Sequence, residues 1–393
     1  MNSDPVVILA ARRTPVGAFQ GAFASVTAPQ LGSVAIKAAL ADSGIPASQV
    51  NEVIMGCVLA AGIGQAPARQ AALGAGIPSS VPSTTVNKMC GSAMRAVMLA
   101  CDQILAGSAD VVVAGGLESM TNAPYLLPKA RAGYRMGNQE VLDHMFYDGL
   151  QSPWDGKLMG CFAEATSEKY EFTRKAQDDF AAESLRRSLA AIANGDFAAE
   201  IAAVTAKTRK GEVLVDKDET PFTLDINKIP TLKPAFKKDG TVTAASSSGI
   251  SDGAAALVLA RESFAASQGK KPLARILGYT SFAREPEWFT LAPVGAMQKL
   301  LTQLNWQAKD VDLYEINEAF AAVPMVAIKD LGLDHQKVNV HGGACALGHP
   351  IGATGARITT TLLHALRARG LRRGVASLCI GGGEATALAL ETI

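Results

Sequence analysis

The 393-residue chain lacks the features that mark several large classes of protein. Its formal net charge is +1, so no general field attracts it to nucleic acid or to a membrane surface. No uncharged apolar run approaches the ~20 residues that a membrane helix needs. The start, residues 1–5, lacks the basic region of a secretory signal. From these absences we expect a cytoplasmic protein.

The six cysteines form no CxxC pair and show no regular spacing. A disulfide scaffold is therefore not expected in a chain of this size, and free thiols are typical of a reducing compartment. Cys57, Cys101 and Cys345 have ordinary surroundings, and we expect them to be buried structural residues. Cys90 and Cys379 differ from these because small residues and glycines lie beside them.

The predicted elements repeat in the same order in the two ends of the chain. Each copy contains an amphipathic helix, a short apolar strand, a small-residue turn and a closing apolar strand that runs into glycines. In chain order, these elements occupy residues 35–40, 50–55, 90–92 and 111–116 in the first copy, and 296–301, 311–316, 342–344 and 376–383 in the second. Apolar strands that alternate with helices predict a layered α/β pseudo-dimer whose sheets are covered on both faces.

Residues 120–250 have no counterpart in the second copy and include a polar helical stretch, predicted over 163–194. Such a long excursion is usually functional, so we interpret it as a lid or a substrate-binding region. A mildly basic stretch, 207–238, is interpreted as a solvated surface, with passage of an anionic substrate as the alternative. The predicted division is an N-terminal α/β half (1–119, completed by about 251–272), an inserted loop domain (120–250) and a C-terminal α/β half (273–393).

Cys90 lies between a β-prone run, 83–89, and a helical pattern that begins at Ala93. At a helix N-terminus the macrodipole and the free N–H groups favour an anion and lower the pKa of a thiol. The pattern therefore predicts an activated nucleophile. A buried structural cysteine is the alternative.

His349 lies in the glycine-rich loop 348–355, which opens a helix predicted to end near residue 369. Its plausible role is to take the proton of Cys90, as in other Cys–His pairs, and a satisfied polar residue is the alternative.

Cys379 ends a predicted strand and precedes three glycines. These glycines could cradle a phosphate, although neither the P-loop nor the G-x-G-x-x-G pattern fits them. A second thiol could instead act as a general acid and base on the α-carbon of an acyl group. The residue types alone leave both interpretations open.

Asn317 follows the predicted strand 311–316. An asparagine at a strand end can hydrogen-bond a water or a carbonyl oxygen, but it can equally cap a helix. This segment on its own does not favour either interpretation.

Taken together, these segments closely resemble the thiolase family, and in particular its biosynthetic members, over nearly the whole chain. The matching motifs are 87–92, 115–120, 317–320, 348–355 and 379–383. The resemblance implies a duplicated, layered α/β/α/β/α fold with an inserted loop domain. It also implies an acyltransferase that catalyses a reversible Claisen condensation of two acetyl-CoA to acetoacetyl-CoA and CoA.

The resemblance also implies a role for each reactive residue. Cys90 would be the acylated nucleophile, His349 its activator, and Cys379 the base that deprotonates the second acetyl-CoA. A water held by Asn317, together with His349, would form one oxyanion hole. The backbone N–H groups of Cys90 and Gly381 would form the other, where the developing charge needs stabilisation.

The same resemblance places the pantetheine arm of CoA against the insertion. The implied contacts are Leu150, Leu158, Met159, Phe236, Ala244, Ser248, Ala319 and Phe320, with Phe289 lining the acyl pocket. It implies no metal and no cofactor, because the CoA thioester is the substrate. The expected partner is a second copy of the chain, in a homotetramer (a dimer of dimers) formed through the loop 126–136, and no nucleic acid or membrane.

Four alternatives to this function remain. The nearest is a degradative thiolase that cleaves longer 3-oxoacyl-CoAs. A ketoacyl-synthase-type enzyme shares the duplicated fold, but the Cys379–glycine segment argues against it. A Cys–His hydrolase would release free acetate, and a non-catalytic lipid-binding or scaffold relative would be expected to have lost the reactive side chains.

Overall fold

The computed structural model describes residues 4–209 and 211–393. Residues 1–3 of the predicted N-terminal half and Lys210 of the basic stretch lie outside the described residues. One large mixed sheet crosses the molecule. Its strands are β1 (Val6–Arg13), β2 (Gly17–Ala18), β3 (Glu52–Gly56), β4 (Ser83–Val86), β5 (Val111–Ser119), β10 (Ser251–Arg261), β11 (Ala274–Ala283), β12 (Leu313–Ile316), β13 (Arg373–Ile380) and β14 (Glu384–Thr392).

The sheet is built from two copies of one arrangement. The strand order is β12-β13-β14-β11-β1-β10-β5-β3-β4, with β2 beside β10. In the first copy β3 runs parallel to β4 and β5, and then β5, β10 and β1 pair antiparallel. In the second copy β12 and β13 are parallel, and β13, β14 and β11 pair antiparallel. Val338 bridges Tyr314 in the parallel sense and supplies the counterpart of β4. The predicted duplication is confirmed.

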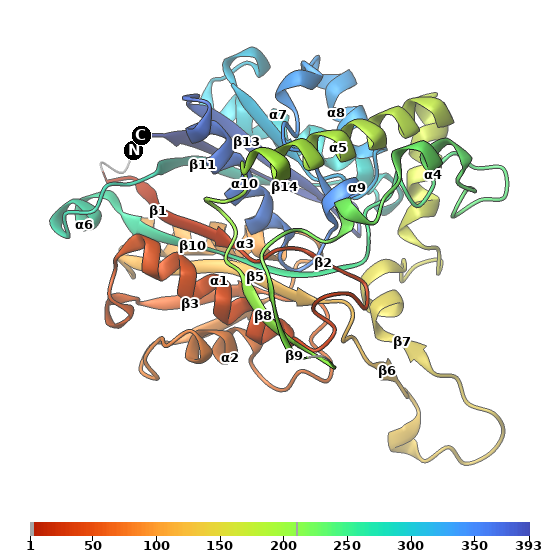
Figure 1. Ribbon diagram of the computed structural model, residues 1–393, viewed down its shortest axis with the longest axis horizontal. Coiled ribbons are helices and arrows are strands. Elements are labelled where there is room, and N and C mark those ends of the chain that lie inside the picture. Colours follow the sequence, from red (N-terminus) through yellow and green to blue (C-terminus); the bar gives the residue numbers. More distant parts are fainter. Residues whose placement is uncertain (1–3, 210) are drawn as a thin grey trace.

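Helices cover both faces of each copy (Figure 1). They are α1 (Ala28–Ser43), α2 (Pro67–Gly74), α3 (Ser92–Ala106), α6 (Glu262–Ser267), α7 (Ala292–Leu304), α8 (Ala322–Leu331) and α10 (Thr354–Ala368). The short helix α9 (Ala344–Leu347) precedes α10.

Alternation along the strands explains the layers, because successive side chains point to opposite faces of a sheet. In β10, Leu257 and Leu259 belong to a core with α3 and α10, whereas Ala256 and Val258 belong to a core with α1 and α2. A third core joins α7 and α8 to β12, β13 and β14. The layers therefore follow the predicted order α/β/α/β/α, with α3 and α10 shared between the two copies.

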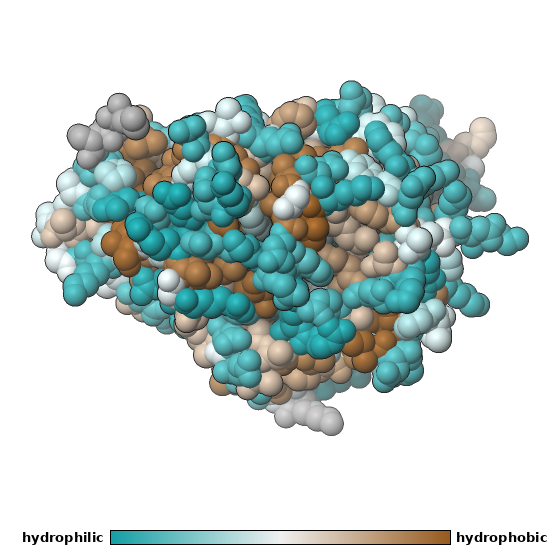
Figure 2. Space-filling view, turned by 90° about the horizontal axis from the view of Figure 1, so that it is seen from above, coloured by the Kyte–Doolittle hydropathy of each residue, from teal (hydrophilic) through white to brown (hydrophobic). Residues whose placement is uncertain are grey.

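The insertion between β5 and β10 contributes two hairpins and two helices. These are β6 (Tyr125–Leu126) with β7 (Leu142–Asp143), β8 (Val204–Thr208) with β9 (Gly211–Val215), α4 (Met159–Lys169) and α5 (Arg174–Asn194). The chain between β6 and β7 projects away from the body of the molecule (Figure 1). Hydrophilic side chains cover most of the face in Figure 2, with smaller apolar patches between them. Among the described residues, no helix combines the length and apolar character needed to span a membrane.

The helical stretch predicted over 163–194 is confirmed as helical, but it consists of two helices, α4 and α5, with a break between them. Glu171 adopts a left-handed conformation with φ of 58°, which ends the first helix. The Thr173 hydroxyl then accepts a hydrogen bond from the Ala176 N–H and caps the second helix.

The contact between α3 and α10 needs a residue without a side chain. A Cβ added at Gly355 would meet the backbone nitrogen of Met94 and lie 2.7 Å from the Met94 Cβ. We predict that Gly355→Ala forces the two helices apart and lowers the free energy of unfolding by about 1–3 kcal/mol, the usual cost of overpacking. Thermal and denaturant unfolding would measure this loss.

The control is Ala368→Ser, which adds one heavy atom at an exposed position of the same helix. Its effect should stay within about 0.5 kcal/mol, as for most surface substitutions. Equal stabilities of the two variants would contradict the proposed packing.

Candidate active site

A cavity of about 350 Å³ lies where the two copies and the insertion meet. Four of the predicted catalytic residues line it, namely Cys90, His349, Cys379 and Gly381. All of the predicted substrate contacts line it too: Leu150, Leu158, Met159, Phe236, Ala244, Ser248, Phe289, Ala319 and Phe320. The structure therefore brings these residues into one place, although they are far apart in the sequence.

Cys90 lies on a tight turn between β4 and α3. The Asn87 side chain accepts a hydrogen bond from the Met89 N–H at 2.9 Å, and the Ser92 hydroxyl accepts one from the Lys88 N–H at 2.8 Å. Met89 has a φ of 47°, in the left-handed region that non-glycine residues rarely adopt. Such strain is concentrated at functional sites, where the surrounding contacts maintain it.

The turn of Cys90 packs directly on the end of β13. A Cβ at Gly91 would lie 3.0 Å from Cγ1 of Ile380, so a side chain there would push the two segments apart. Cys379 precedes Ile380 on this strand, and residues 381–383 form the hairpin that leads into β14. This close approach brings both thiols to the same cavity.

The prediction of a lowered pKa for Cys90 is wrong. Burial raises the pKa of this thiol to about 11, although hydrogen bonds from the Gly381 N–H and from its own N–H favour the thiolate. The helix α3 begins only at Ser92, so Cys90 lies outside the first turn, where the helix dipole acts. Burial also raises the pKa of Cys379 well above its usual range, and the nearby Cys90 adds to the effect.

His349 is buried, with 5% of its surface exposed. This burial, together with the smaller effect of the positive charge of Arg357, lowers its pKa to about 3. The imidazole is therefore neutral at physiological pH. One of its ring nitrogens, Nδ1, lies 2.7 Å from the hydroxyl of Thr354, a residue that the sequence did not single out.

Asn317 does not line the cavity but lies next to the ring of His349. It does not cap a helix, because α8 begins only at Ala322. Its N–H donates to the Ser377 carbonyl at 3.0 Å. Its amide nitrogen lies 3.5 Å from both ring nitrogens of His349, at the limit of a hydrogen bond. Its amide oxygen is buried and accepts no hydrogen bond from the described residues, so this acceptor remains available beside the imidazole.

Glu118 is a buried carboxylate that the sequence reasoning missed. It accepts hydrogen bonds from the N–H groups of Val58, Leu59 and Gly352, at 3.0, 3.1 and 2.9 Å. Gly352 belongs to the loop of His349, so Glu118 ties that loop to the first copy. Burial raises the pKa of Glu118 to about 7. The sequence feature that could have identified Glu118 is its charge, which stands alone in the otherwise uncharged strand β5.

Glu318, next to Asn317, makes a second internal tether that was missed. It accepts hydrogen bonds from the Ser184 hydroxyl at 2.6 Å, the Asn339 amide at 2.9 Å and the Cys345 N–H at 3.0 Å. Ser184 belongs to α5, so this carboxylate joins the insertion to the strand end that carries Asn317.

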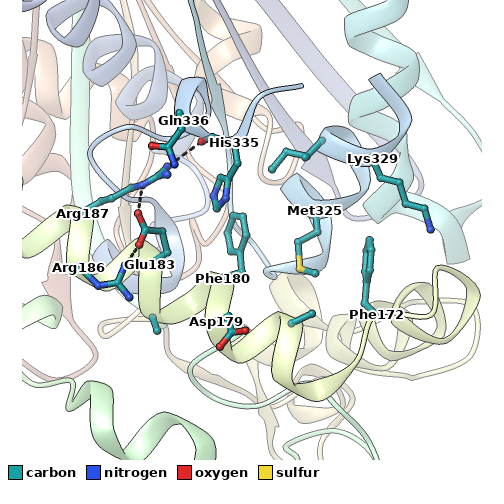
Figure 3. Close-up of a pocket in the computed structure, with 13 residues that line it drawn as sticks. Phe172, Asp179, Phe180, Glu183, Arg186, Arg187, Met325, Lys329, His335 and Gln336 are labelled. Atoms are coloured by element: carbon teal, nitrogen blue, oxygen red, sulfur yellow. Dashed lines mark hydrogen bonds and ion pairs between the residues drawn. The ribbon is translucent and has the colours of Figure 1, made fainter. Parts of the chain in front are cut away.

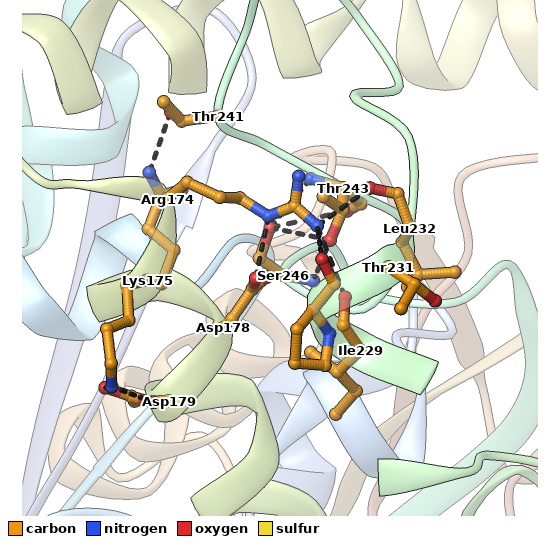
Figure 4. A network of polar contacts seen from close by, with 12 residues as sticks. Arg174, Lys175, Asp178, Asp179, Ile229, Thr231, Leu232, Thr241, Thr243 and Ser246 are labelled. Atoms are coloured by element: carbon orange, nitrogen blue, oxygen red, sulfur yellow. Dashed lines mark hydrogen bonds and ion pairs between the residues drawn. The ribbon is translucent and has the colours of Figure 1, made fainter. Parts of the chain in front are cut away.

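A polar network at the start of α5 lies beside the segment 243–248, which borders the cavity (Figure 4). Arg174 donates to Asp178 at 2.8 Å and to the carbonyls of Leu232 and Ile229 at 2.8 and 3.2 Å. Beside it, the Thr243 N–H donates to the Ser246 hydroxyl at 2.8 Å. The contacts of Arg174 tie α5 to residues 229–232. The contact between Thr243 and Ser246 orders the segment 243–248, whose small residues border the cavity.

A larger cavity, of about 690 Å³, lies between α5 and α8 (Figure 3). Its floor is apolar, with Phe172 and Met325, and Phe180 stacks on His335 with 5.0 Å between the ring centres. None of the described residues that line it is a cysteine. The nucleophilic groups therefore point to the smaller cavity as the site of chemistry.

Comparison with known families gives two matches that together span nearly all of the chain. Residues 6–263 match the thiolase N-terminal domain, and residues 270–392 match the thiolase C-terminal domain. The chain is 49% identical to an acetyl-CoA acetyltransferase of Chromobacterium violaceum, over 98% of this chain and 99% of that protein. It is also 49% identical to an acetyl-CoA acetyltransferase of Escherichia coli, over 98% and 99% of the two chains.

Two solved structures have the same fold as this chain. The acetyl-CoA acetyltransferase of Bacillus anthracis superposes with a TM-score of 0.97 and 44% identity, over 100% of both chains. A thiolase from Ascaris suum in complex with coenzyme A superposes with a TM-score of 0.94 and 42% identity, over 99% of this chain and 100% of that one.

The raised pKa of Cys90 predicts how its reactivity depends on pH. Well below a pKa of about 11, the thiolate fraction grows ~tenfold per pH unit. We expect alkylation of Cys90 by iodoacetamide, followed by peptide mass spectrometry, to rise steadily between about pH 7 and pH 9. The neutral His349 should add no ionisation step in this range.

Cys90→Ser identifies the modified peptide and serves as the control. A plateau of Cys90 alkylation below about pH 8 would instead indicate a preformed thiolate and contradict the prediction.

Proposed function

The chain belongs to the thiolase family, and on this premise we propose that it is an acetyl-CoA C-acetyltransferase. The reaction is a reversible Claisen condensation of two acetyl-CoA to acetoacetyl-CoA and free CoA, in a ping-pong sequence through an acetyl group on Cys90. The observation that carries the proposal is that Cys90, His349 and Cys379 line one largely apolar cavity.

In the first half-reaction, the Cys90 sulfur attacks the thioester carbonyl carbon while its proton passes to His349. The tetrahedral intermediate collapses, and CoA leaves with the proton of Cys379, which becomes a thiolate, while His349 keeps the proton of Cys90. The Cys90 pKa is raised and the His349 pKa is lowered, which supports proton transfer during the attack rather than a preformed ion pair. The oxyanion would receive hydrogen bonds from the N–H groups of Cys90 and Gly381, where the loss of one donor typically costs ~10²–10³ in rate.

In the second half-reaction, Cys379 as a thiolate removes a proton from the methyl group of the second acetyl-CoA. The resulting enolate attacks the acetyl carbonyl on Cys90, a carbon–carbon bond forms, and the Cys90 sulfur leaves and regains its proton from His349. A water on Asn317, together with the Nε2–H of His349, which carries the proton from Cys90 at this stage, would stabilise the enolate oxygen. The buried amide oxygen of Asn317, which has no partner among the described residues, supports this role.

The pantetheine arm would enter between the insertion and the second copy. The aromatic rings of Phe236, Phe289 and Phe320 meet edge to face there, with ring centres 5.9 and 6.5 Å apart. We propose that Phe289 borders the acyl group. The reaction needs no metal and no resident cofactor. We also propose a cytoplasmic homotetramer, with the projecting loop 126–136 at an interface between subunits.

The direct test is incubation with isotope-labelled acetyl-CoA, followed by peptide mass spectrometry. We expect one acetyl group, bound to Cys90 and released as acetoacetyl-CoA when more acetyl-CoA is added. Absence of the label from Cys90 would overturn the proposal, and steady release of free acetate would indicate a hydrolase. A higher kcat/KM in thiolysis of longer 3-oxoacyl-CoAs than of acetoacetyl-CoA would indicate the degradative activity.

The two half-reactions should respond differently to loss of the second thiol. In Cys379→Ala we expect condensation to fall by at least ~10², the usual contribution of a general base, while acetylation of Cys90 falls less than about tenfold. Quenched-flow measurement of both steps would separate these effects.

The matched control is Cys161→Ala, which deletes a half-buried thiol that does not line the cavity. This variant should keep both rates. An equal loss of both half-reactions in Cys379→Ala would count against Cys379 as the base.

A further inference from the structure

The imidazole of His349 is held by a hydroxyl group. Its Nδ1 lies 2.7 Å from Oγ1 of Thr354, at the first residue of α10. Thr354 is completely buried. Among the described residues, the other group within hydrogen-bond distance of the ring is the amide nitrogen of Asn317, at 3.5 Å. The short contact to Thr354 therefore dominates the orientation of the ring.

The direction of this hydrogen bond follows from a count of protons. A hydroxyl carries one hydrogen, and that of Thr354 donates to the Pro350 carbonyl at 2.9 Å. Toward His349 the hydroxyl oxygen can therefore only accept. The Nδ1 atom must then carry the single hydrogen of the neutral imidazole, which leaves a lone pair on Nε2.

We propose that Thr354 is a positioning residue, which fixes His349 as the Nδ1–H tautomer so that Nε2 can take the proton of Cys90. The inference rests on the function proposed above, and it adds the group that leaves Nε2 of His349 free to accept the proton of Cys90. In the opposite tautomer Nε2 would carry a hydrogen, and the imidazole could not accept the thiol proton there.

A hydroxyl suits this site better than a carboxylate would. A carboxylate beside Nδ1 would favour the imidazolium and stabilise a permanent ion pair with the thiolate. The Thr354 oxygen instead orients a ring that burial keeps neutral. The proton that His349 takes from Cys90 is therefore bound weakly and returns readily to the Cys90 sulfur when this leaves the acetyl group.

The test compares Thr354→Val, which keeps the shape and removes the hydroxyl, with Thr354→Ser, which keeps the hydroxyl. Thr359→Val is the matched control. Thr359 is completely buried in the same helix, and its hydroxyl donates to the Gly355 carbonyl at 2.8 Å, with the same spacing of four residues. It therefore reports the cost of losing such a bond away from the imidazole.

The first readout is the single-turnover rate of Cys90 acetylation. We expect Thr354→Val to lose about 10- to 100-fold in this rate, as for one hydrogen bond that orients a base, and KM to change little. Thr354→Ser and Thr359→Val should stay within about threefold of the parent protein. An unchanged rate in Thr354→Val, or a loss in Thr354→Ser as large as in Thr354→Val, would overturn the proposal.

The second readout is ¹⁵N NMR of histidine-labelled protein, which distinguishes a protonated ring nitrogen from a bare one. The chain has five histidines, and His349→Asn assigns the signals of this ring. We expect a protonated Nδ1 in the parent protein and in Thr354→Ser, and a shift toward a protonated Nε2 in Thr354→Val. A bare Nδ1 in the parent protein would overturn the inference even if Thr354→Val failed to fold.

The two proposals can fail separately. If labelled acetyl-CoA leaves no acetyl group on Cys90 of the parent protein, the proposed function is wrong. The NMR measurement would still decide whether Thr354 fixes the tautomer.

Discussion

The contact between α3 and α10 is the constraint on which the active centre depends. Met94 is near the start of α3 and Gly355 is the second residue of α10, so the helices approach each other at their first turns. The segment before α3 carries Cys90, and the loop before α10 carries His349. Two residues separated by most of the chain thus reach one cavity because two helix starts meet without an intervening side chain.

Burial gives this centre a resting state without charge. The pKa of Cys90 is raised and that of His349 is lowered, so neither group ionises near neutral pH. An ion pair would lose its hydration in such a site, which is costly even with a partner. In the proposed mechanism, charge therefore develops only during the reaction, beside the N–H groups of Cys90 and Gly381.

The sequence predicted the elements well where the signal is local. The strands that end at Ile316 and Ile380 and the helix after His349 follow from apolar runs and periodicity. The break at Glu171 was missed because a left-handed residue other than glycine has no clear sequence signal. The pKa of Cys90 was predicted in the wrong direction, because the helix end is visible in the sequence and the degree of burial is not.

The missed polar residues share a different cause. Glu118 accepts a hydrogen bond from Gly352, and Glu318 accepts one from Ser184, which are distant in the sequence. Only the fold brings such partners together. Thr354 is near His349 in the sequence, but its role depends on the direction of a hydrogen bond and could not be read from residue types.

The two copies differ at one turn, and this difference explains why the enzyme needs both. Lys88 bridges Cys90 in the first copy, and Val340 makes the corresponding bridge to Gly342 in the second. A side chain at Gly342 would lie 2.9 Å from the Ser188 nitrogen, because α5 covers this turn. The insertion thus fills the space beside Gly342, at the turn that corresponds to the turn of Cys90 in the first copy.

The chain after the turn also differs between the copies. In the first copy α3 begins at Ser92, almost directly after Cys90, whereas in the second α10 begins only at Thr354. The additional residues form α9 and the loop that carries His349. One copy of the unit therefore supplies the proposed nucleophile, Cys90, on a short turn, and the other supplies its proposed base, His349, on a longer loop. Neither copy alone contains both groups, so both copies of the unit are needed to form the active site.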